Sequence, residues 1–396
     1  MTASTANGIP PAHEAASRRK ILVVFGTRPE AIKMLPLVRT LTAEPSLEVR
    51  VCVTAQHREM LDQVLDLFNV RADYDLDIMT RAQGLEQVTT AVLTGVSAVL
   101  DEWRPDRMLV HGDTATAMAA ALAAFYKKVP VGHVEAGLRS GDPLQPWPEE
   151  VNRRLIDAIA DQYYAPTAGT RDNLLREGAR PDAVFLTGNT VIDALLAMAD
   201  LVESDHSVSR GLEDRFSFLA QDRPLLLVTG HRRENFGQPL LDICAAVSEL
   251  ALQHPLQVIY PIHPNPNVSG PVRRALADRP HVHLVEPLEY LPFVYLMQRS
   301  HAILTDSGGI QEEAPSLGKP VFVTRNVTER PEAVAAGTVE LVGTDPGTII
   351  DRVGRVFVAR EPHNRMTRRM NPYGDGQASR RIADILAGRE TEEFQP

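Results

Sequence analysis

The chain has 396 residues, which is more than one hydrophobic core usually supports, and we therefore expect two domains. Its formal net charge of -10 offers no excess positive field to hold a phosphate backbone, which argues against a nucleic-acid partner. The two cysteines, Cys52 and Cys244, lie in apolar segments and are expected to be buried free thiols, as suits the cytoplasm.

The start of the chain carries no targeting signal that we recognise. Residues 1–19 lack the apolar core of a signal peptide, and we expect a disordered tail there. Because no later apolar run is long enough to cross a bilayer, no association with a membrane is expected.

Residues 20–201 alternate short apolar runs with longer helical patterns. Such alternation is typical of βαβ units on a parallel sheet, so we expect one α/β domain here. The expected strands lie within residues 21–25, 48–54, 107–113, 129–134, 163–166 and 184–188.

A second alternation follows a charged stretch at 202–222, which we interpret as a linker region. Residues 223–375 are expected to form a second α/β domain, and residues 376–396 a closing helix that packs back on the first domain. Ligands of open parallel sheets bind outside the carboxyl ends of the strands, so two facing sheets predict a cleft lined by strand-to-helix turns.

The first such turn, "FGTRPEAIK", contains neither the glycine pattern of a dinucleotide site nor that of a P-loop. It offers Arg28 and Lys33 near the expected start of a helix, where free N–H groups favour an anion. The alternative is an ordinary helix begun by proline, with solvated charges.

The turns of the second domain carry a similar design. His231 and two arginines follow one strand in "VTGHRRENFG", where guanidinium groups and a charged imidazole would suit a diphosphate. In "TDSGGIQEE", Ser307 and Gly308 allow a ligand to approach the backbone, and Glu313 could accept ribose hydroxyl protons. Compensation of a helix dipole explains Glu313 equally well.

Histidines elsewhere do not predict a metal site. His281 and His283 share one face of an expected strand, but no third ligand stands at metal-binding spacing.

Three acids follow successive strands of the first domain. Asp113 could cap the next helix, and Glu149 could stabilise the first turn of its own helix while facing Arg153 four residues on. Glu135 has no such structural role, so its carboxylate at the end of an apolar strand indicates a function. If the three carboxylates are crowded, raised pKa values would let one of them act as an acid near neutral pH.

Many blocks in order, including "FGTRPEAIKMLPLV", "HVEAGLRSGD", "PWPEEVNR", "TGHRREN" and "TDSGGIQEEAPSLGKP", resemble the non-hydrolysing UDP-N-acetylglucosamine 2-epimerases. The resemblance covers nearly the whole chain after the tail. It implies two facing Rossmann-like domains in the glycosyltransferase-B arrangement, a homodimer, and no metal or nicotinamide cofactor. The implied UDP contacts are Arg28, Lys33, His231, Ser307, Gly308, Glu313 and Arg330, and the implied catalytic residues are Asp113, Glu135, Glu149, Arg153 and His231.

The activity that the resemblance implies is reversible inversion at C2 of UDP-N-acetylglucosamine, giving UDP-N-acetylmannosamine. Since the C2 hydrogen is hardly acidic, UDP is expected to leave first, and the oxocarbenium-like sugar then loses that proton to form 2-acetamidoglucal. A hydrolysing epimerase, which would release UDP and N-acetylmannosamine, remains an alternative. So do a UDP-sugar glycosyltransferase and a non-catalytic sensor of nucleotide sugars.

Some bacterial members of this family bind a second UDP-N-acetylglucosamine that switches the enzyme on. Gln56 and His57 in "TAQHREM" match that region, while Glu59 stands where some regulated members carry glutamine. The sequence leaves allosteric activation open.

Overall fold

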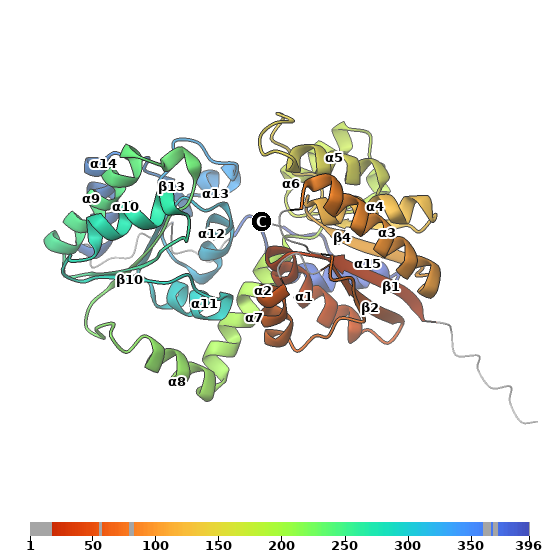
Figure 1. The fold of residues 1–396 in the computed structure, drawn as a ribbon, viewed down its shortest axis with the longest axis horizontal. Coiled ribbons are helices and arrows are strands. Elements are labelled where there is room, and N and C mark those ends of the chain that lie inside the picture. Colours follow the sequence, from red (N-terminus) through yellow and green to blue (C-terminus); the bar gives the residue numbers. More distant parts are fainter. Residues whose placement is uncertain (1–17, 55–57, 79–82, 359–365, 367–370, 396) are drawn as a thin grey trace, which may run out of the picture.

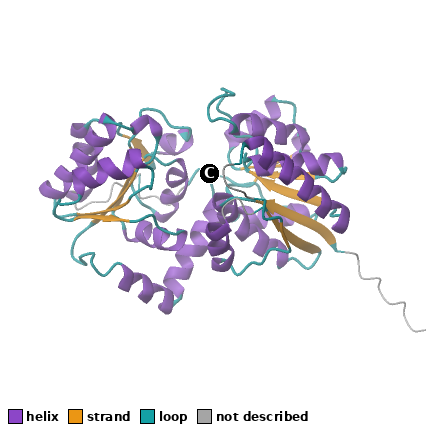
Figure 2. Cartoon of the chain, in the orientation of Figure 1, coloured by secondary structure: helices purple, strands orange, loops and turns teal. Residues whose placement is uncertain are grey.

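The computed structural model describes residues 18–54, 58–78, 83–358, 366 and 371–395. Residues 1–17 of the expected tail and the two expected allosteric residues, Gln56 and His57, lie outside the described part. The described chain forms two lobes, each built on a sheet with helices on both sides (Figures 1 and 2).

The first lobe contains a parallel sheet in the order β3-β2-β1-β4-β5-β6-β7. The order reverses direction between β1 and β4, and this switch point is where ligands of such sheets bind. Its strands are β1 (Arg19–Phe25), β2 (Leu47–Val53), β3 (Tyr74–Asp75), β4 (Arg107–His111), β5 (Val131–Val134), β6 (Gln162–Ala165) and β7 (Val184–Leu186). Its helices are α1 (Arg28–Thr42), α2 (Arg58–Leu67), α3 (Leu85–Trp103), α4 (Ala115–Tyr126), α5 (Glu149–Ile159), α6 (Ala168–Arg176) and α7 (Thr190–Ser204), with a short 3-10 turn η1 (Pro181–Ala183).

Alternate residues of β1 face opposite sides of this sheet. Ile21 and Phe25 belong to the hydrophobic cluster that contains α1 and α7 side chains, whereas Leu22 and Val24 belong to the cluster with α3 and α4. Both faces are therefore covered, which explains why the strand is a continuous apolar run.

The second lobe has a parallel sheet in the order β10-β9-β8-β11-β12-β13, which reverses between β8 and β11. Its strands are β8 (Leu225–Thr229), β9 (Gln257–Pro261), β10 (Val282–Val285), β11 (Ala302–Thr305), β12 (Val321–Val323) and β13 (Val339–Leu341). Its helices are α9 (Gln238–Gln253), α10 (Pro266–Leu276), α11 (Tyr290–Arg299), α12 (Gly308–Glu313), α13 (Pro331–Ala336) and α14 (Pro346–Val358), with the 3-10 turns η2 (Arg233–Asn235) and η3 (Ala314–Leu317).

The lobes are joined through α7, whose apolar side chains lie in the same buried cluster as those of α11. The stretch interpreted as a linker, 202–222, contains the helix α8 (His206–Arg215), which lies below the junction in Figure 1. Because one cluster contains side chains from both lobes, hydrophobic burial contributes to holding the lobes together.

The last helix, α15 (Ala378–Leu386), packs against α1 and α7 of the first lobe. Asp193 of α7 accepts hydrogen bonds from the backbone N–H groups of Ala378 (3.3 Å) and Ser379 (2.7 Å) at the start of this helix. Burial raises the pKa of the Asp193 carboxyl to about 6. The chain thus crosses to the second lobe and returns to the first.

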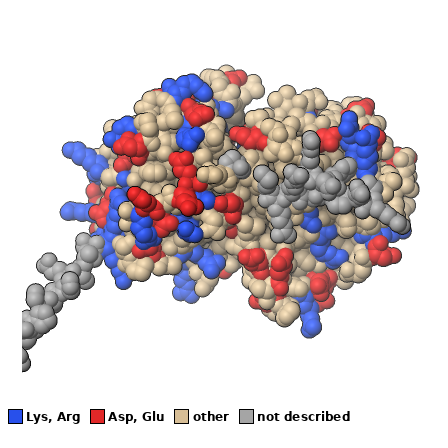
Figure 3. Space-filling view, turned by 180° about the vertical axis from the view of Figure 1, so that it is seen from behind, with Lys and Arg blue, Asp and Glu red and all other residues tan. Residues whose placement is uncertain are grey.

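Cys52 and Cys244 are both buried and unbonded, as expected. Within the described residues no helix combines the length and the apolar character needed to cross a membrane. On the face shown in Figure 3, basic and acidic side chains are interspersed over both lobes.

Candidate active site

The first turn of the first lobe is organised by Glu30, which the sequence reasoning did not single out. Thr27 caps α1, and Glu30 Oε2 accepts hydrogen bonds from the N–H groups of Gly26 (3.2 Å) and Thr27 (2.8 Å). Its other oxygen accepts from the Thr114 hydroxyl at 2.8 Å, in the turn after β4. This buried carboxylate therefore fixes the two turns at the switch point against each other.

Glu135 follows β5 and lies against Lys33 and His111, which come from α1 and β4. Lys33 Nζ lies 2.5 Å and His111 Nε2 lies 2.8 Å from the same carboxylate oxygen, Oε2. Among the described residues no hydrogen bond reaches Oε1. The backbone of Glu135 has a φ of 64°, in the left-handed region that non-glycine residues rarely occupy, and such strain is typical of functional positions.

These partners decide the charge of Glu135. Burial disfavours the ionised form, but the charges and hydrogen bonds of Lys33 and His111 outweigh it and hold the pKa of Glu135 well below its usual range. The expectation that crowded carboxylates raise one another's pKa is therefore wrong for Glu135, whose nearest charged neighbour is the Lys33 ammonium.

Asp113 follows β4 and is paired with Arg153 of α5. The Asp113 carboxylate forms an ion pair with the Arg153 guanidinium, and Asn152 Nδ2 donates to the Asp113 backbone oxygen at 2.9 Å. The alternative that Asp113 caps the next helix is wrong, because Thr114 is the cap of α4 and accepts from Ala117 N at 3.0 Å.

Glu149 is the first residue of α5 but does not pair with Arg153 as the helical spacing suggested. Its neighbour Glu150 instead forms the ion pairs, with Arg154 at 3.0 Å and Arg153 at 3.7 Å. The Oε2 atom of Glu149 is buried without a hydrogen-bond partner in the described residues. The structure thus brings Asp113 and Arg153 together and shows no direct hydrogen bond between Glu149 and the other two acids.

His231 follows β8 in the second lobe, where Asp306 organises the turn. Asp306 is 1 % exposed and accepts hydrogen bonds from the backbone N–H groups of His231 (2.9 Å) and Arg232 (2.9 Å). The His231 ring stacks on His263 with 5.4 Å between ring centroids. Burial lowers the pKa of His231, and the nearby Arg232 and His263 add to this against the opposing charge of Asp306.

In the ligand-free chain this lowered pKa favours the neutral imidazole, with one N–H donor, over the charged form that the sequence reasoning expected beside a diphosphate. Positive charge comes from arginines instead. A Cβ atom placed on Gly308 would lie 3.6 Å from Arg232 Nη2 and 4.0 Å from Arg330 Nη2. The two guanidinium groups thus flank the start of α12, an arrangement suited to an anion.

Arg330 is held in turn by an ion pair with Glu312. Burial opposes its charge, but Glu312 and Glu135 more than compensate, and the pKa of Arg330 is raised. Asn189 of the first lobe donates to Glu312 at 3.2 Å, so this ion pair lies where the two lobes meet.

Glu313 ends α12 and is buried against Tyr290 of α11, whose hydroxyl donates to Glu313 Oε1 at 2.7 Å. Burial raises the pKa of Glu313 to about 7, although the Tyr290 hydrogen bond acts in the opposite direction. Because α12 has only six residues, Glu313 lies at its carboxyl end. The alternative that Glu313 compensates the helix dipole is therefore wrong.

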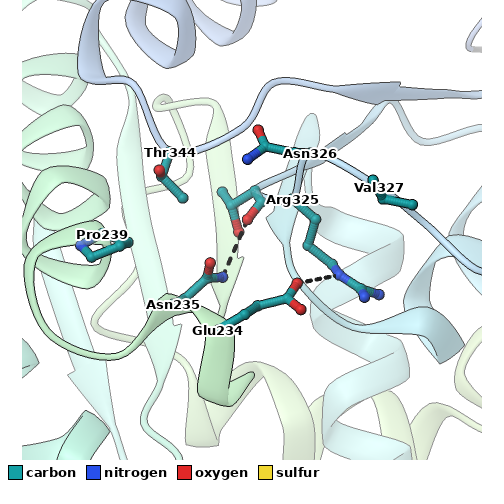
Figure 4. Close-up of a pocket in the computed structure, with 8 residues that line it drawn as sticks. Glu234, Asn235, Pro239, Arg325, Asn326, Val327 and Thr344 are labelled. Atoms are coloured by element: carbon teal, nitrogen blue, oxygen red, sulfur yellow. Dashed lines mark hydrogen bonds and ion pairs between the residues drawn. The ribbon is translucent and has the colours of Figure 1, made fainter. Parts of the chain in front are cut away.

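A separate pocket in the second lobe is lined by residues of η2 and of the segment that follows β12 (Figure 4). Asn235 donates to the Thr324 backbone oxygen at 3.2 Å, and Glu234 pairs with Arg325 at 2.5 Å. Since Asn235 also donates to Asp306 at 3.2 Å, this pocket shares its framework with the turn that carries His231.

The two sets of strand ends face each other across the lobes. Arg28 Nη2 donates to the Leu288 backbone oxygen of the second lobe at 3.3 Å. The pKa of Lys33 is lowered by burial but raised more strongly by Glu135 and by Glu312 of the second lobe. Residues of both lobes therefore belong to one electrostatic unit.

The described residues contain no group of three or more histidine, cysteine or acidic side chains that could hold a metal ion. Sequence reasoning missed His111, Glu30, Asp306 and Tyr290. His111 and Asp306 had a usable signal, since each ends a strand beside a glycine-containing turn. Tyr290 had none, because its contact with Glu313 joins residues 23 positions apart.

The chain resembles known proteins along nearly its whole length. A family model described as UDP-N-acetylglucosamine 2-epimerase matches residues 39–387. The UDP-N-acetylglucosamine 2-epimerase of Yersinia pestis is 55% identical over 372 residues, which cover 94% of this chain and 99% of the relative. The crystal structure of UDP-GlcNAc 2-epimerase from Neisseria meningitidis bound to UDP-GlcNAc matches with a TM-score of 0.86 at 50% identity, over 93% of this chain and 100% of that chain.

A more distant match is the Methanocaldococcus jannaschii UDP-GlcNAc 2-epimerase in complex with UDP-GlcNAc and UDP. It has a TM-score of 0.77 at 33% identity, over 93% of this chain and 99% of that chain. These likenesses confirm the expected pair of facing Rossmann-like domains in the glycosyltransferase-B arrangement.

Proposed function

This chain belongs to the UDP-N-acetylglucosamine 2-epimerase family, and we propose that it inverts C2 by releasing UDP, forming 2-acetamidoglucal and adding UDP back. It is an isomerase that acts on UDP-N-acetylglucosamine, and its ligands are this nucleotide sugar and UDP. The observation that carries the mechanism is the electrostatic unit described above, in which the Lys33–Glu135 pair of one lobe faces the Glu312–Arg330 pair of the other.

The second lobe is suited to the leaving group. Arg232 and Arg330 flank Gly308, so a diphosphate at the start of α12 would meet two guanidinium groups and backbone N–H donors. His231, held neutral by burial, would donate its ring N–H to the departing phosphate oxygen. Fixed donors aimed at developing negative charge are among the largest contributions to catalysis.

The remaining proposed UDP contacts surround this diphosphate position. Glu313 Oε2 would lie 3.9 Å from a Cβ atom placed on Gly309, as would Ser307 Oγ, so both side chains face the backbone where the nucleotide approaches. We assign Glu313 to the ribose hydroxyls. Arg28 and Lys33 would contact UDP from the side of the first lobe.

The first lobe is suited to the sugar. Glu135 is ionised at neutral pH and stabilises the positive charge that develops at C1 when UDP leaves. Asp113, oriented by Arg153, and Glu149 at the start of α5 then exchange the C2 proton on opposite faces. The unpartnered Oε2 of Glu149 is free to take part in proton transfer.

We further propose a homodimer formed through the first lobe. Val151 and Leu155 are exposed on one face of α5, and Ile159 continues this face into a hollow lined by Phe125 and Tyr126. Contiguous exposed apolar side chains of this kind are typical of protein interfaces. A cytoplasmic location agrees with the two free buried thiols. Activation through Gln56 and His57 remains a proposal from the family resemblance.

The test of the reaction is a proton NMR time course with UDP-N-acetylglucosamine in deuterated water, without added metal or nicotinamide. We expect UDP-N-acetylmannosamine to accumulate to an equilibrium with deuterium at C2. Release of UDP with free N-acetylmannosamine would instead establish a hydrolysing epimerase, and turnover only with an added acceptor would indicate a glycosyltransferase.

A variant pair makes this test specific to the residues. Asp113→Asn should abolish most of the deuterium incorporation. Asp161→Asn is the matched control, because Asp161 also pairs with an arginine, Arg107 at 2.5 Å, but at the amino ends of the strands, away from the candidate site. An equal loss of deuterium incorporation in both variants would contradict the role of Asp113 in C2 proton exchange.

A further inference from the structure

His133 of β5 lies fully buried between two acceptors. Its Nδ1 atom is 2.6 Å from Asp157 Oδ1 of α5, and its Nε2 atom is 2.7 Å from the backbone oxygen of Gly112. A carbonyl oxygen cannot donate, and a carboxylate donates only when protonated. The ring therefore makes both hydrogen bonds only if it carries a proton on each nitrogen or if Asp157 is protonated.

The surroundings of Asp157 favour its ionised form. Arg139 Nη2 donates to Asp157 Oδ2 at 2.7 Å, and a guanidinium cannot accept a proton back. Burial raises the pKa of Asp157, but His133 and Arg139 outweigh burial and hold it below its usual value. The protons thus belong to the histidine.

We propose that His133 is an imidazolium that acts as a positioning residue for Asp113, by donating one N–H to the Gly112 carbonyl and the other to Asp157. This inference deepens the proposed function: the importance of Asp113 depends on the proposed reaction, whereas the protonation state of His133 does not depend on it.

The hydrogen bond from His133 to the Gly112 carbonyl fixes the peptide that precedes Asp113. Gly112 has a φ of 62° and directly precedes Asp113, and its N–H donates to the Val134 oxygen at 2.9 Å. With its carbonyl held by His133 and the Asp113 carbonyl held by Asn152, the backbone of the turn is fixed on both sides of Asp113. A charge-assisted hydrogen bond is about twice as strong as a neutral one, which suits a turn with this conformation.

Several charged groups lie around the ring. Arg139 is shared between Asp157 and Glu177, whose Oε2 lies 2.6 Å from Arg139 Nη2. Tyr163 of β6 directs its hydroxyl to the Asp157 backbone oxygen at 2.9 Å and adds no charge. Helix α4, on the same side of the sheet, carries no charged side chain. The hydrogen bond of Arg139 and the charge of Arg154 lower the pKa of Glu177, so the carboxylate whose charge the imidazolium compensates is Asp157.

Helix α5 contributes to positioning both the side chain and the backbone of Asp113. Arg153 and Asp157 are four residues apart and so lie on the same face of α5. The first contacts the Asp113 carboxylate and the second contacts Asp113 through His133 and Gly112. One rigid element therefore sets the side chain and the backbone of Asp113 together.

The direct test is proton–nitrogen NMR of the whole chain labelled with 15N-histidine, at neutral pH. We expect two slowly exchanging ring N–H signals for His133, identified among the 12 histidines by their absence in His133→Gln. In Asp157→Asn the amide can donate to Nδ1, so the Nδ1 proton should be lost and the Nε2 proton kept. A single ring N–H signal in the unchanged chain would overturn the imidazolium, whatever the enzyme's substrate.

The positioning role is tested by kinetics of C2 deuterium exchange. His133→Gln should lower kcat roughly 10- to 100-fold with little change in KM, because a misplaced group affects the chemical step. The decrease in kcat should be smaller for Asp157→Asn than for Asp157→Leu, since asparagine can still hydrogen-bond to a neutral His133 ring and orient it. An unchanged kcat in a folded His133→Gln chain would overturn the positioning role. If that variant does not fold, equal kcat values for Asp157→Asn and Asp157→Leu overturn it instead.

Discussion

The two sets of strand ends use opposite electrostatic designs. In the first lobe Glu135 and Asp113 have cationic partners, Lys33 and Arg153, and Glu135 stays ionised. In the second lobe the arginines near Gly308 dominate, His231 is neutral, and Glu313 titrates near pH 7. This difference fits the proposed mechanism, in which the first lobe faces a cationic sugar and the second an anionic leaving group.

The largest effect is expected from Glu135→Gln, which removes the fixed negative charge of the first lobe. The rate of C2 exchange should fall about 10²- to 10³-fold, the range for removing one electrostatic contact to the transition state. UDP affinity, measured by calorimetry, should change little, because the arginines that face the diphosphate are intact. Strong loss of UDP binding in this variant would contradict the assignment of the sugar to the first lobe and of UDP to the second.

Arg232→Ala tests the other side of the comparison. UDP affinity should weaken by about 1.5–3 kcal/mol, the cost of losing a hydrogen bond to a charged group. The control is Arg355→Ala, since Arg355 pairs at 2.6 Å with Asp351 four residues away on the exposed face of α14. Calorimetric titration of UDP should give a weaker affinity for Arg232→Ala than for Arg355→Ala. Similar affinities in the two variants would contradict the proposed diphosphate position at Gly308.

Glu313 gives the second lobe's part of the site a pH dependence that Glu135 does not give the first, while Asp193 of α7, with a pKa raised to about 6, adds one outside the site. The folded pKa of Glu313, about 7, lies above the usual 4.5, so the folded chain binds more protons between these values. The free energy of unfolding of the ligand-free protein should therefore fall by roughly a few kcal/mol as the pH rises through this window. His231, with a lowered pKa, acts in the opposite direction below its usual value of 6.5, so the comparison needs a variant.

Urea unfolding at pH 5 and pH 7.5 provides that comparison for Glu313→Gln. The glutamine chain should lose less stability over this range than the unchanged chain. Glu135 does not interfere, because its lowered pKa gives stability that is lost only as the pH falls below about 4.5. Identical slopes in both chains would show that Glu313 is not buried as described.

The smallest effect is expected from Tyr290→Phe. It removes the hydroxyl that donates to Glu313 at 2.7 Å and should cost about 1 kcal/mol of stability at neutral pH. Because this hydrogen bond lowers the pKa of Glu313, its loss should move the stability transition to higher pH. Unfolding curves across pH 6 to 9 would detect the shift, and a shift toward lower pH would contradict the contact.

The sequence predicted the fold well where local patterns and tertiary packing agree. Runs of apolar residues became parallel strands, and Arg28 begins a helix as its following proline indicated. The pairing of Asp113 with Arg153 was not predicted, because the helical spacing assigned Arg153 to Glu149. The length of α12 was missed too, although Pro315 shortly after Glu313 cannot donate a backbone hydrogen bond and so helps to end the helix.

The sequence by itself determined the alternating α/β architecture, the turns that carry the functional residues and the family resemblance, because hydrophobic periodicity and motif spacing are local properties. Only the tertiary structure decided the charge of each group. Glu135 is ionised because Lys33 and His111 reach it from other turns, and Glu313 titrates near pH 7 because α11 buries it. A pKa depends on burial and on neighbours distant in the chain, which residue spacing does not record.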